Sequence, residues 1–169
     1  MQSKLIIIRG NSGSGKTTTA KSLQNHLGSG TLLVSQDMVR RDMLMVQDKE
    51  GNLSMDLIRQ IAEFGKDKCE YVIVEGILSK NRYGEMLNNL IQFYNSNTYT
   101  YYFDLSFEET VKRHNSRTKK FEFGEDSLRA WWNPNDYLSV EGEIILTDEM
   151  SQSDVFELIL DQIKNYKVL

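Results

Sequence analysis

Short apolar runs alternate with segments of helical spacing along the whole chain. The runs that predict strands are Leu5–Arg9, Leu32–Ser35, Tyr71–Glu75, Tyr99–Leu105 and Glu143–Thr147. The first and the third are almost continuously apolar, which is typical of strands covered on both faces. Strands that alternate with helices in this way predict a parallel α/β sheet.

Apolar residues at intervals of three and four predict the helices between these strands. One such face comprises Tyr83, Met86, Leu87, Leu90, Ile91 and Tyr94, and another comprises Val155, Leu158, Ile159, Ile163 and Tyr166. Ser79 suits the N-cap of the first of these helices. Ser106 and Glu109 have the spacing of a capping box at the start of a further helix. We interpret all of these residues as core or caps.

Two segments, Gln36–Asn52 and Thr118–Val140, break the regular alternation. Each is a long surface connection or, in an enzyme, a segment that binds a ligand or closes over it. The sole proline, Pro134, lies in the second segment among polar turn residues. No repeat or linker divides the chain.

The composition is that of one globular domain. The 169 residues are too few for two ordinary domains, and 40% hydrophobic with 26% charged residues is near the globular average. A net charge of -4 gives no general attraction to nucleic acid or to an anionic membrane. No apolar run approaches the roughly 20 residues that span a bilayer, and MQSKLIII lacks a signal-peptide pattern, so we expect a cytoplasmic protein. Cys69 is the only cysteine, which excludes an intramolecular disulfide or a cysteine metal cluster.

The segment Gly10–Thr17, GNSGSGKT, has the complete pattern of a phosphate-binding loop between a strand and a helix. Its glycines let backbone N–H groups close around phosphates, and the helix N-terminus adds a favourable dipole. Lys16 can reach the β- and γ-phosphates, and the Thr17 hydroxyl can coordinate Mg²⁺. We predict that ATP binds through Gly10, Asn11, Ser12, Gly13, Ser14, Gly15, Lys16, Thr17 and Thr18. The alternative is a glycine turn beside a solvated lysine.

Glu75 ends the third predicted strand, just before Gly76. Proteins with a phosphate loop commonly place an acidic residue near the Mg²⁺ shell at this position. We predict that Glu75 joins Thr17 around the metal. The alternatives are contact with the acceptor and an ordinary strand-end carboxylate.

Asp37 and Arg40 follow the second predicted strand, where ligands of open α/β sheets usually bind. On a helix, residues three apart lie on one side, so a carboxylate and a guanidinium can address one substrate. Asp37 could accept the proton of an attacking hydroxyl, and Arg40 could hold an acceptor phosphate or the transferring phosphoryl group. An N-cap role also suits Asp37. Arg41 and Asp42 are interpreted as a solvated pair.

A phosphate-loop lysine followed about twenty residues later by Asp-x-x-Arg resembles the polynucleotide kinase, zeta-toxin and gluconate-kinase-like branch of P-loop kinases, whose members are often labelled uridine kinase or AAA-family ATPase. The resemblance extends to Phe107–His114, Phe123–Gly124 and Leu128–Trp132. It implies a three-layer P-loop fold with a five-stranded parallel sheet in the order 2-3-1-4-5 and a helical lid. It also implies that Asp37 is the general base and that Arg40 binds the acceptor. We expect one P-loop kinase domain over 1–169, with a candidate acceptor segment at about 36–60 and a lid at about 113–138.

Positive charge is concentrated between residues 112 and 129. Arg113 and Arg117 are four apart, so both can project from one face of a helix. The resemblance implies that Arg113 stacks on adenine and that Arg117 stabilises the transferring charge; the alternative is that both complement a helix C-terminus. Lys119 and Lys120 are expected to be solvated, and His114 is expected to be a surface helix histidine.

Aromatic and sulfur-containing side chains flank the predicted site. Trp131 and Trp132 are expected to anchor the lid, and the alternative is stacking on a planar acceptor. Four methionines border the same region: Met38, Met43, Met45 and Met55. Ordinary packing is the expectation for them, with an acceptor pocket as the alternative.

These observations favour an ATP-dependent kinase that moves the γ-phosphoryl group to a hydroxyl of a small molecule or nucleoside, as a uridine kinase does. A polynucleotide 5′-hydroxyl kinase is the second candidate, but the net charge does not indicate the basic trough that it needs. A nucleotide-dependent regulatory switch is the third; the chain lacks a guanine-reading Asn-Lys-x-Asp motif. The acceptor and the oligomeric state stay open.

Overall fold

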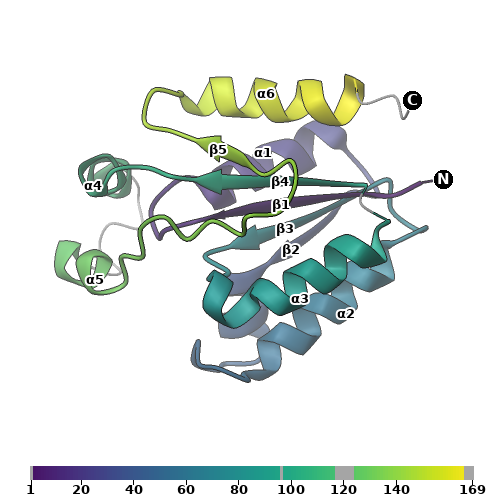
Figure 1. Ribbon diagram of the computed structural model, residues 1–169, viewed down its shortest axis with the longest axis horizontal. Coiled ribbons are helices and arrows are strands. Elements are labelled where there is room, and N and C mark those ends of the chain that lie inside the picture. Colours follow the sequence, from purple (N-terminus) through teal and green to yellow (C-terminus); the bar gives the residue numbers. More distant parts are fainter. Residues whose placement is uncertain (1, 96, 117–123, 166–169) are drawn as a thin grey trace.

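A five-stranded sheet with helices on both faces makes up the molecule (Figure 1). The computed structural model describes residues 2–95, 97–116 and 124–165. The strands are β1 Lys4–Gly10, β2 Leu32–Ser35, β3 Tyr71–Gly76, β4 Thr98–Phe103 and β5 Ile144–Leu146. All neighbouring strands pair in parallel, in the order β2-β3-β1-β4-β5. The predicted fold class, sheet order and five strands are confirmed, with ends that shift by one or two residues.

Helices cover both faces of the sheet and extend beyond one of its edges. They are α1 Lys16–Leu27, the π-helix η1 Met38–Met43, α2 Leu53–Gly65, α3 Lys80–Phe93, α4 Phe107–Asn115, α5 Glu125–Ala130 and α6 Gln152–Asn165. Helices α1 and α6 cover one face of the sheet, and α2 and α3 cover the other (Figure 1). In the part of the chain that the structure describes, no helix is both long and apolar enough to cross a membrane.

The central strand β1 shows why the sheet is buried on both faces. Leu5 and Ile7 belong to the core under α2 and α3, whereas Ile6 and Ile8 belong to the core under α1 and α6. Side chains alternate along a strand, so a strand with a core on each side must be apolar at every position. This explains the continuous apolar run in the sequence.

The two predicted caps behave differently. The Ser106 hydroxyl accepts a hydrogen bond from Glu109 N at 3.2 Å, but the Glu109 carboxylate pairs with Arg113 instead of reaching back to Ser106. Only half of the capping box is therefore formed. Ser79 stands at the N-cap position of α3 without a side-chain capping bond.

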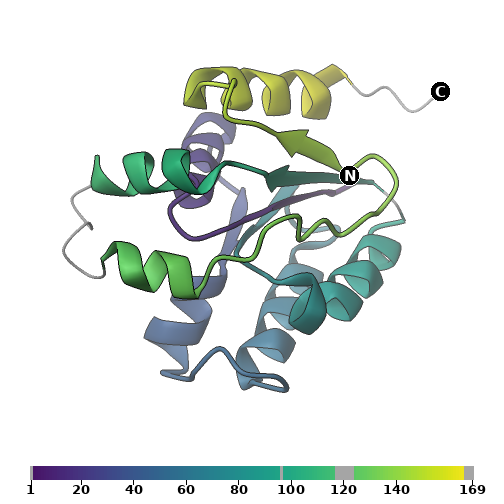
Figure 2. The same ribbon diagram turned by 60° about the vertical axis from the view of Figure 1, so that its left-hand side comes forward.

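The carboxyl ends of the strands point to one edge of the sheet, and α4 and α5 lie beyond that edge (Figure 1). Figure 2 shows these two helices side by side. Thr118–Val140 thus contains α5, and Gln36–Asn52 contains η1. Tyr166 of the predicted last helix lies outside the described residues. The candidate site is built at this edge.

Candidate nucleotide and acceptor site

The phosphate loop leaves β1 at Gly10 and rests against β4 and α4. A Cβ on Gly10 would lie 2.8 Å from the Phe103 Cβ, and one on Gly13 would lie 3.2 Å from the Thr110 Cγ2. Both glycines also have positive φ, 147° and 86°. Only glycine suits this conformation at such close approach. The loop is therefore held in one shape by its neighbours.

Lys16 begins α1 and folds back over the loop. Its ammonium donates to Asn11 O at 2.6 Å and to Ser14 Oγ at 3.3 Å, and only 7% of the residue is exposed. These contacts keep the charge inside the loop, where phosphate oxygens would bind. Ser12 is half-buried at its rim, and Thr18 is exposed on the first turn of α1.

Glu75 is buried at the carboxyl end of β3 and is held by two hydroxyl groups. Thr17 Oγ1 donates to its Oε2 at 3.1 Å, and Ser35 Oγ donates to its Oε1 at 2.6 Å. Ser35 pairs with Glu75 in the β2–β3 register. The sequence prediction named Thr17 and Glu75 but missed Ser35, whose only signal is its place at the end of β2.

The oxygen atoms of Thr17 and Glu75 fit Mg²⁺, which prefers hard oxygen ligands. Among the described residues, no group of three or more His, Cys, Asp or Glu side chains is arranged to hold a metal ion. A cation at this position would take its remaining ligands from phosphate oxygens and water, as Mg²⁺ usually does.

Asp37 lies two residues beyond β2, with its carboxylate open to solvent. It pairs with Arg40 at 3.3 Å and with Arg41 at 3.4 Å, and 65% of its side chain is exposed. Arg40 also donates to Val46 O at 3.3 Å, so it bridges the two ends of η1. Asp37 stands at the N-cap position but makes no capping bond. Arg41 and Asp42 are both exposed, as expected, and Arg41 pairs with Asp37.

Three of the four methionines on the candidate acceptor segment are exposed. Met38, Met43 and Met45 are 49%, 55% and 87% exposed, whereas Met55 packs against the core. The π-helical turn explains the exposure of Met38 and Met43, because its wider spacing turns only Val39 into the core, whereas Met45 lies beyond η1. Packing was therefore the wrong interpretation for three of these methionines.

Arg113 joins the phosphate loop to the loop before α6. Its guanidinium donates to Ser14 O at 3.1 Å, to Met150 O at 3.3 Å and to the Glu109 carboxylate at 2.7 Å. The hydrogen bond from Arg113 lowers the pKa of the Glu109 carboxyl group. Arg113 thus lies beside the loop, and stacking on adenine stays a prediction. Arg117, Lys119 and Lys120 lie outside the described residues.

His114 is buried, with 3% of the residue exposed, so the expected surface position was wrong. A Cβ on Gly13 would lie 3.5 Å from the His114 Cβ, next to Thr110 on the same face of α4. The face of α4 that meets the phosphate loop carries these two residues. Helical periodicity could not reveal this burial, because the partner of that face is a polar loop.

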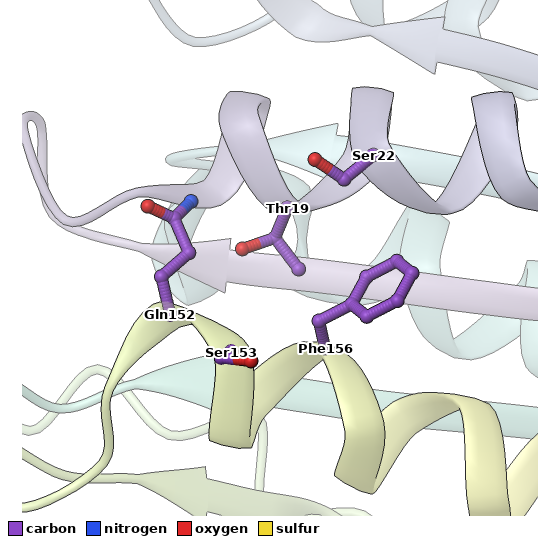
Figure 3. Close-up of a pocket in the computed structure, with 5 residues that line it drawn as sticks. All are labelled: Thr19, Ser22, Gln152, Ser153 and Phe156. Atoms are coloured by element: carbon purple, nitrogen blue, oxygen red, sulfur yellow. The ribbon is translucent and has the colours of Figure 1, made fainter.

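A pocket of about 320 Å³ lies between α1 and α6, beside the start of α1. Its lining residues are Thr19 and Ser22 from α1 and Gln152, Ser153 and Phe156 from α6 (Figure 3). Thr19 is 1% exposed, and its hydroxyl has no hydrogen-bond partner among the described residues. Figure 3 shows this hydroxyl facing the α6 side of the pocket. Sequence reasoning identified none of these residues.

Helix α5 is anchored to α4 through aromatic contacts. The Trp132 ring meets the Phe107 ring edge-on at 5.3 Å between centroids, and the Arg129 guanidinium lies 4.2 Å from the same ring. Trp132 therefore anchors α5, as expected. Trp131 is 50% exposed.

A family model described as an AAA domain matches residues 5–132, from β1 to just beyond α5. The chain belongs to this AAA domain family. No curated protein sequence matches the chain significantly.

Several solved structures share the fold of this AAA domain along nearly its whole length. A gluconokinase from Sinorhizobium meliloti has a TM-score of 0.70 at 14% identity, with 97% of this chain and 93% of that chain covered. An APS kinase of Mycobacterium tuberculosis, solved with AMPPNP and APS, has a TM-score of 0.69 at 13% identity, with 96% and 98% covered. A tunicamycin resistance protein of Deinococcus radiodurans has a TM-score of 0.64 at 16% identity, with 95% of both chains covered. At these identities the matches show the fold alone.

Proposed function

We propose that this AAA domain is an ATP-dependent phosphotransferase that moves the γ-phosphoryl group of ATP to a hydroxyl of a small molecule or nucleoside. One observation carries the proposal: the Thr17–Glu75–Ser35 cluster connects the phosphate loop, by hydrogen bonds, to the strand that leads into Asp37. A binding loop for the donor and an open carboxylate for the acceptor thus stand on adjoining elements. The names of the structural neighbours, which include gluconokinase and APS kinase, support the same class.

The donor side would work through the phosphate loop. Backbone N–H groups from Gly10 to Thr18 and the Lys16 ammonium would hold the β- and γ-phosphates. Bound Mg²⁺ would neutralise charge on the phosphate oxygens, and Thr17 and Glu75 are the residues that would hold it. Ser35 holds one oxygen of the buried Glu75 carboxylate, so that the other oxygen faces Thr17. This second oxygen is the one that would contact the metal.

The nucleobase would lie near Arg113 and the pocket between α1 and α6. Arg113 is held by hydrogen bonds to Ser14 O in the phosphate loop and to Met150 O just before α6. A planar guanidinium stacks on aromatic rings. The neutral hydroxyl and amide groups of Thr19, Ser22 and Gln152 both donate and accept hydrogen bonds, as recognition of an uncharged base requires. This arrangement supports a nucleoside triphosphate as the donor, for which we propose ATP.

On the acceptor side, Asp37 would take the proton of the attacking hydroxyl. The Asp37 carboxylate is exposed, so a substrate can reach it without any change in the fold. Arg40 beside it would hold the acceptor by charge-assisted hydrogen bonds. The fixed helix α5 would help to exclude water, which otherwise competes with the acceptor.

The test is a screen of hydroxyl compounds, among them uridine, sugars, antibiotics and 5′-hydroxyl oligonucleotides, with phosphorylated products detected by mass. With the best acceptor, Asp37→Asn should lower kcat by about 10²-fold or more and leave the Kd of ATP unchanged, because a general base contributes on that order. Asp42→Asn, an exposed carboxylate on the same turn, is the matched control and should keep full activity.

Two results would contradict the proposal. A fully active Asp37→Asn variant would remove Asp37 as the base. ATP hydrolysis that no hydroxyl compound stimulates or diverts would instead favour the regulatory switch.

A further inference from the structure

The residue before the phosphate loop is a buried arginine. Arg9 lies in the central strand β1 with 0% exposure, and burial lowers the pKa of its guanidinium, against the raising effect of Asp136 and Glu143. A buried cation is costly unless charges and hydrogen bonds surround it. An apolar residue could occupy this strand position at no such cost, so the presence of a buried arginine here requires an explanation.

The Arg9 guanidinium connects three separate parts of the chain. Its Nε donates to Leu78 O at 3.0 Å, its Nη2 donates to Asp136 Oδ2 at 2.8 Å, and its Nη1 lies 3.6 Å from Glu143 Oε1. It also lies 5.5 Å from the centre of the Tyr102 ring. The planar fork of an arginine can reach several acceptors in fixed directions, which a lysine cannot do.

Two of these partners belong to the return segment, residues 131–143, which leads from α5 back along the sheet to β5 (Figure 1, Figure 2). Asp136 is its main attachment point. The carboxylate of Asp136 accepts from Arg9 and from Lys80 N at 2.9 Å, and its own N–H donates to the Tyr102 hydroxyl at 3.2 Å.

The return segment is attached to the phosphate loop at a second point. Asn11 Nδ2 donates to Asn133 O and Asn133 N donates to Asn11 Oδ1, each at 2.9 Å. Asn11 and Arg9 lie on either side of Gly10. The chain that carries α5 is thus fastened to both flanks of the residue at which the phosphate loop begins.

We propose that Arg9 is a positioning residue that, through Asp136, holds the return segment against β1 and so sets where α5 lies relative to the phosphate loop. Apolar residues can often replace a buried ion pair without loss of stability, so stability alone does not require this arrangement. Its catalytic consequence, exclusion of water during transfer, rests on the proposed function; the positioning itself does not.

The two tryptophans of the chain provide a local reporter, because Trp131 and Trp132 lie where α5 passes into the return segment. In a Trp131→Phe background, Trp132 against Phe107 becomes the sole tryptophan. Arg9→Lys and Asp136→Asn should each raise acrylamide quenching of Trp132 at least about twofold, because the segment would open locally more often. The double variant should show a smaller rise than the sum of the two single variants, since both changes break the shared Arg9–Asp136 contact.

Circular dichroism shows whether each variant is folded, and if Arg9→Lys does not fold, Asp136→Asn alone decides. Arg59→Lys, which alters an exposed ion pair on α2, is the control and should not change quenching. Unchanged quenching in a folded Asp136→Asn variant, or additive effects in the double variant, would overturn the proposal. The measurement needs no substrate, so a failure of the kinase assignment would leave its result intact.

The ratio of ATP hydrolysis to transfer is the second measurement, made with any acceptor that the screen finds. It should rise in Asp136→Asn while the Kd of ATP stays the same, because the phosphate loop is untouched. A rise in quenching without this shift would confine the role of Arg9 to the position of α5.

Discussion

The phosphate loop and the candidate acceptor segment lie at the same edge of the sheet, but they are built in opposite ways. On the donor side, Lys16 and Glu75 are 7% and 2% exposed, and both charged groups are hydrogen-bonded inside the protein. On the acceptor side, the Asp37 side chain is 65% exposed and Met45 is 87% exposed. Buried polar groups must be satisfied within the fold, whereas exposed ones can be satisfied by a ligand.

In the proposed reaction, this contrast indicates that the fold specifies the donor half. The donor loop has one geometry, because Gly10 and Gly13 contact β4 and α4 too closely for alternatives. The acceptor side presents a carboxylate, a guanidinium and flexible thioethers whose final arrangement depends on what binds. The same fold can therefore serve different acceptors, as its neighbours' names illustrate.

The largest effect is expected from Lys16→Ala on the donor side. Loss of a buried cation aimed at the phosphates should lower the rate of phosphoryl transfer by about 10² to 10³-fold. Lys21→Ala, an exposed lysine on the same helix, should leave the rate unchanged. Initial rates, with circular dichroism as the check on folding, measure this. Full activity of a folded Lys16→Ala variant would mean that the loop does not hold the donor.

Glu75→Gln should have an intermediate effect. The amide keeps the shape but loses the charge beside Thr17, so the Mg²⁺ concentration for half-maximal ATP turnover should rise about tenfold. Glu70→Gln, which lies at the opposite end of the same strand region, is the matched control. A titration of turnover against Mg²⁺ distinguishes the two. An unchanged Mg²⁺ titration would mean that Glu75 has a structural role and does not contribute to metal binding.

The smallest effect is expected on the free energy of unfolding, when the Glu109–Arg113 ion pair on the donor side is compared with the ion pairs of Asp37 on the acceptor side. Since Arg113 lowers the pKa of Glu109 in the folded protein, the pair stabilises the fold above the unfolded-state pKa of about 4.3 and loses this contribution as pH falls through the folded-state pKa. Glu109→Gln should thus reduce the free energy of unfolding by up to about 1 kcal/mol at pH 7 and by less at pH 3.

Asp37→Asn serves as the comparison, because its carboxylate is mostly solvated and should stabilise the fold very little at either pH. Urea denaturation at the two pH values measures both variants. Equal losses for Glu109→Gln and Asp37→Asn would show that the two sides do not differ in this respect.

Local signals account for what could be predicted. The apolar runs in β1 and β3 and the helical spacing in α3 reflect burial along one element. They therefore predict that element without knowledge of what packs against it. The phosphate loop could be predicted for the same reason, since its glycines, lysine and threonine lie within one short segment. The sheet order came from a family resemblance rather than from these patterns.

Contacts between distant residues account for what could not be predicted. Ser35 and Glu75 are forty positions apart, and Arg9 and Asp136 are 127 apart. His114 is buried by a polar loop and not by an apolar face, so its position in the helix pattern carried no signal. The exposure of Met38 and Met43 followed from a π-helical turn, which has no simple sequence period.

Local patterns in the sequence specify the elements, the phosphate loop and the residue types at the edge of the sheet, because backbone conformation and side-chain periodicity are local properties. Which of these residues meet depends on the tertiary structure. It brought Ser35 and Thr17 to Glu75, fastened the return segment to Arg9, and left Asp37 open to solvent. Such contacts depend on strand register and on how layers pack, and neither is encoded at any single position.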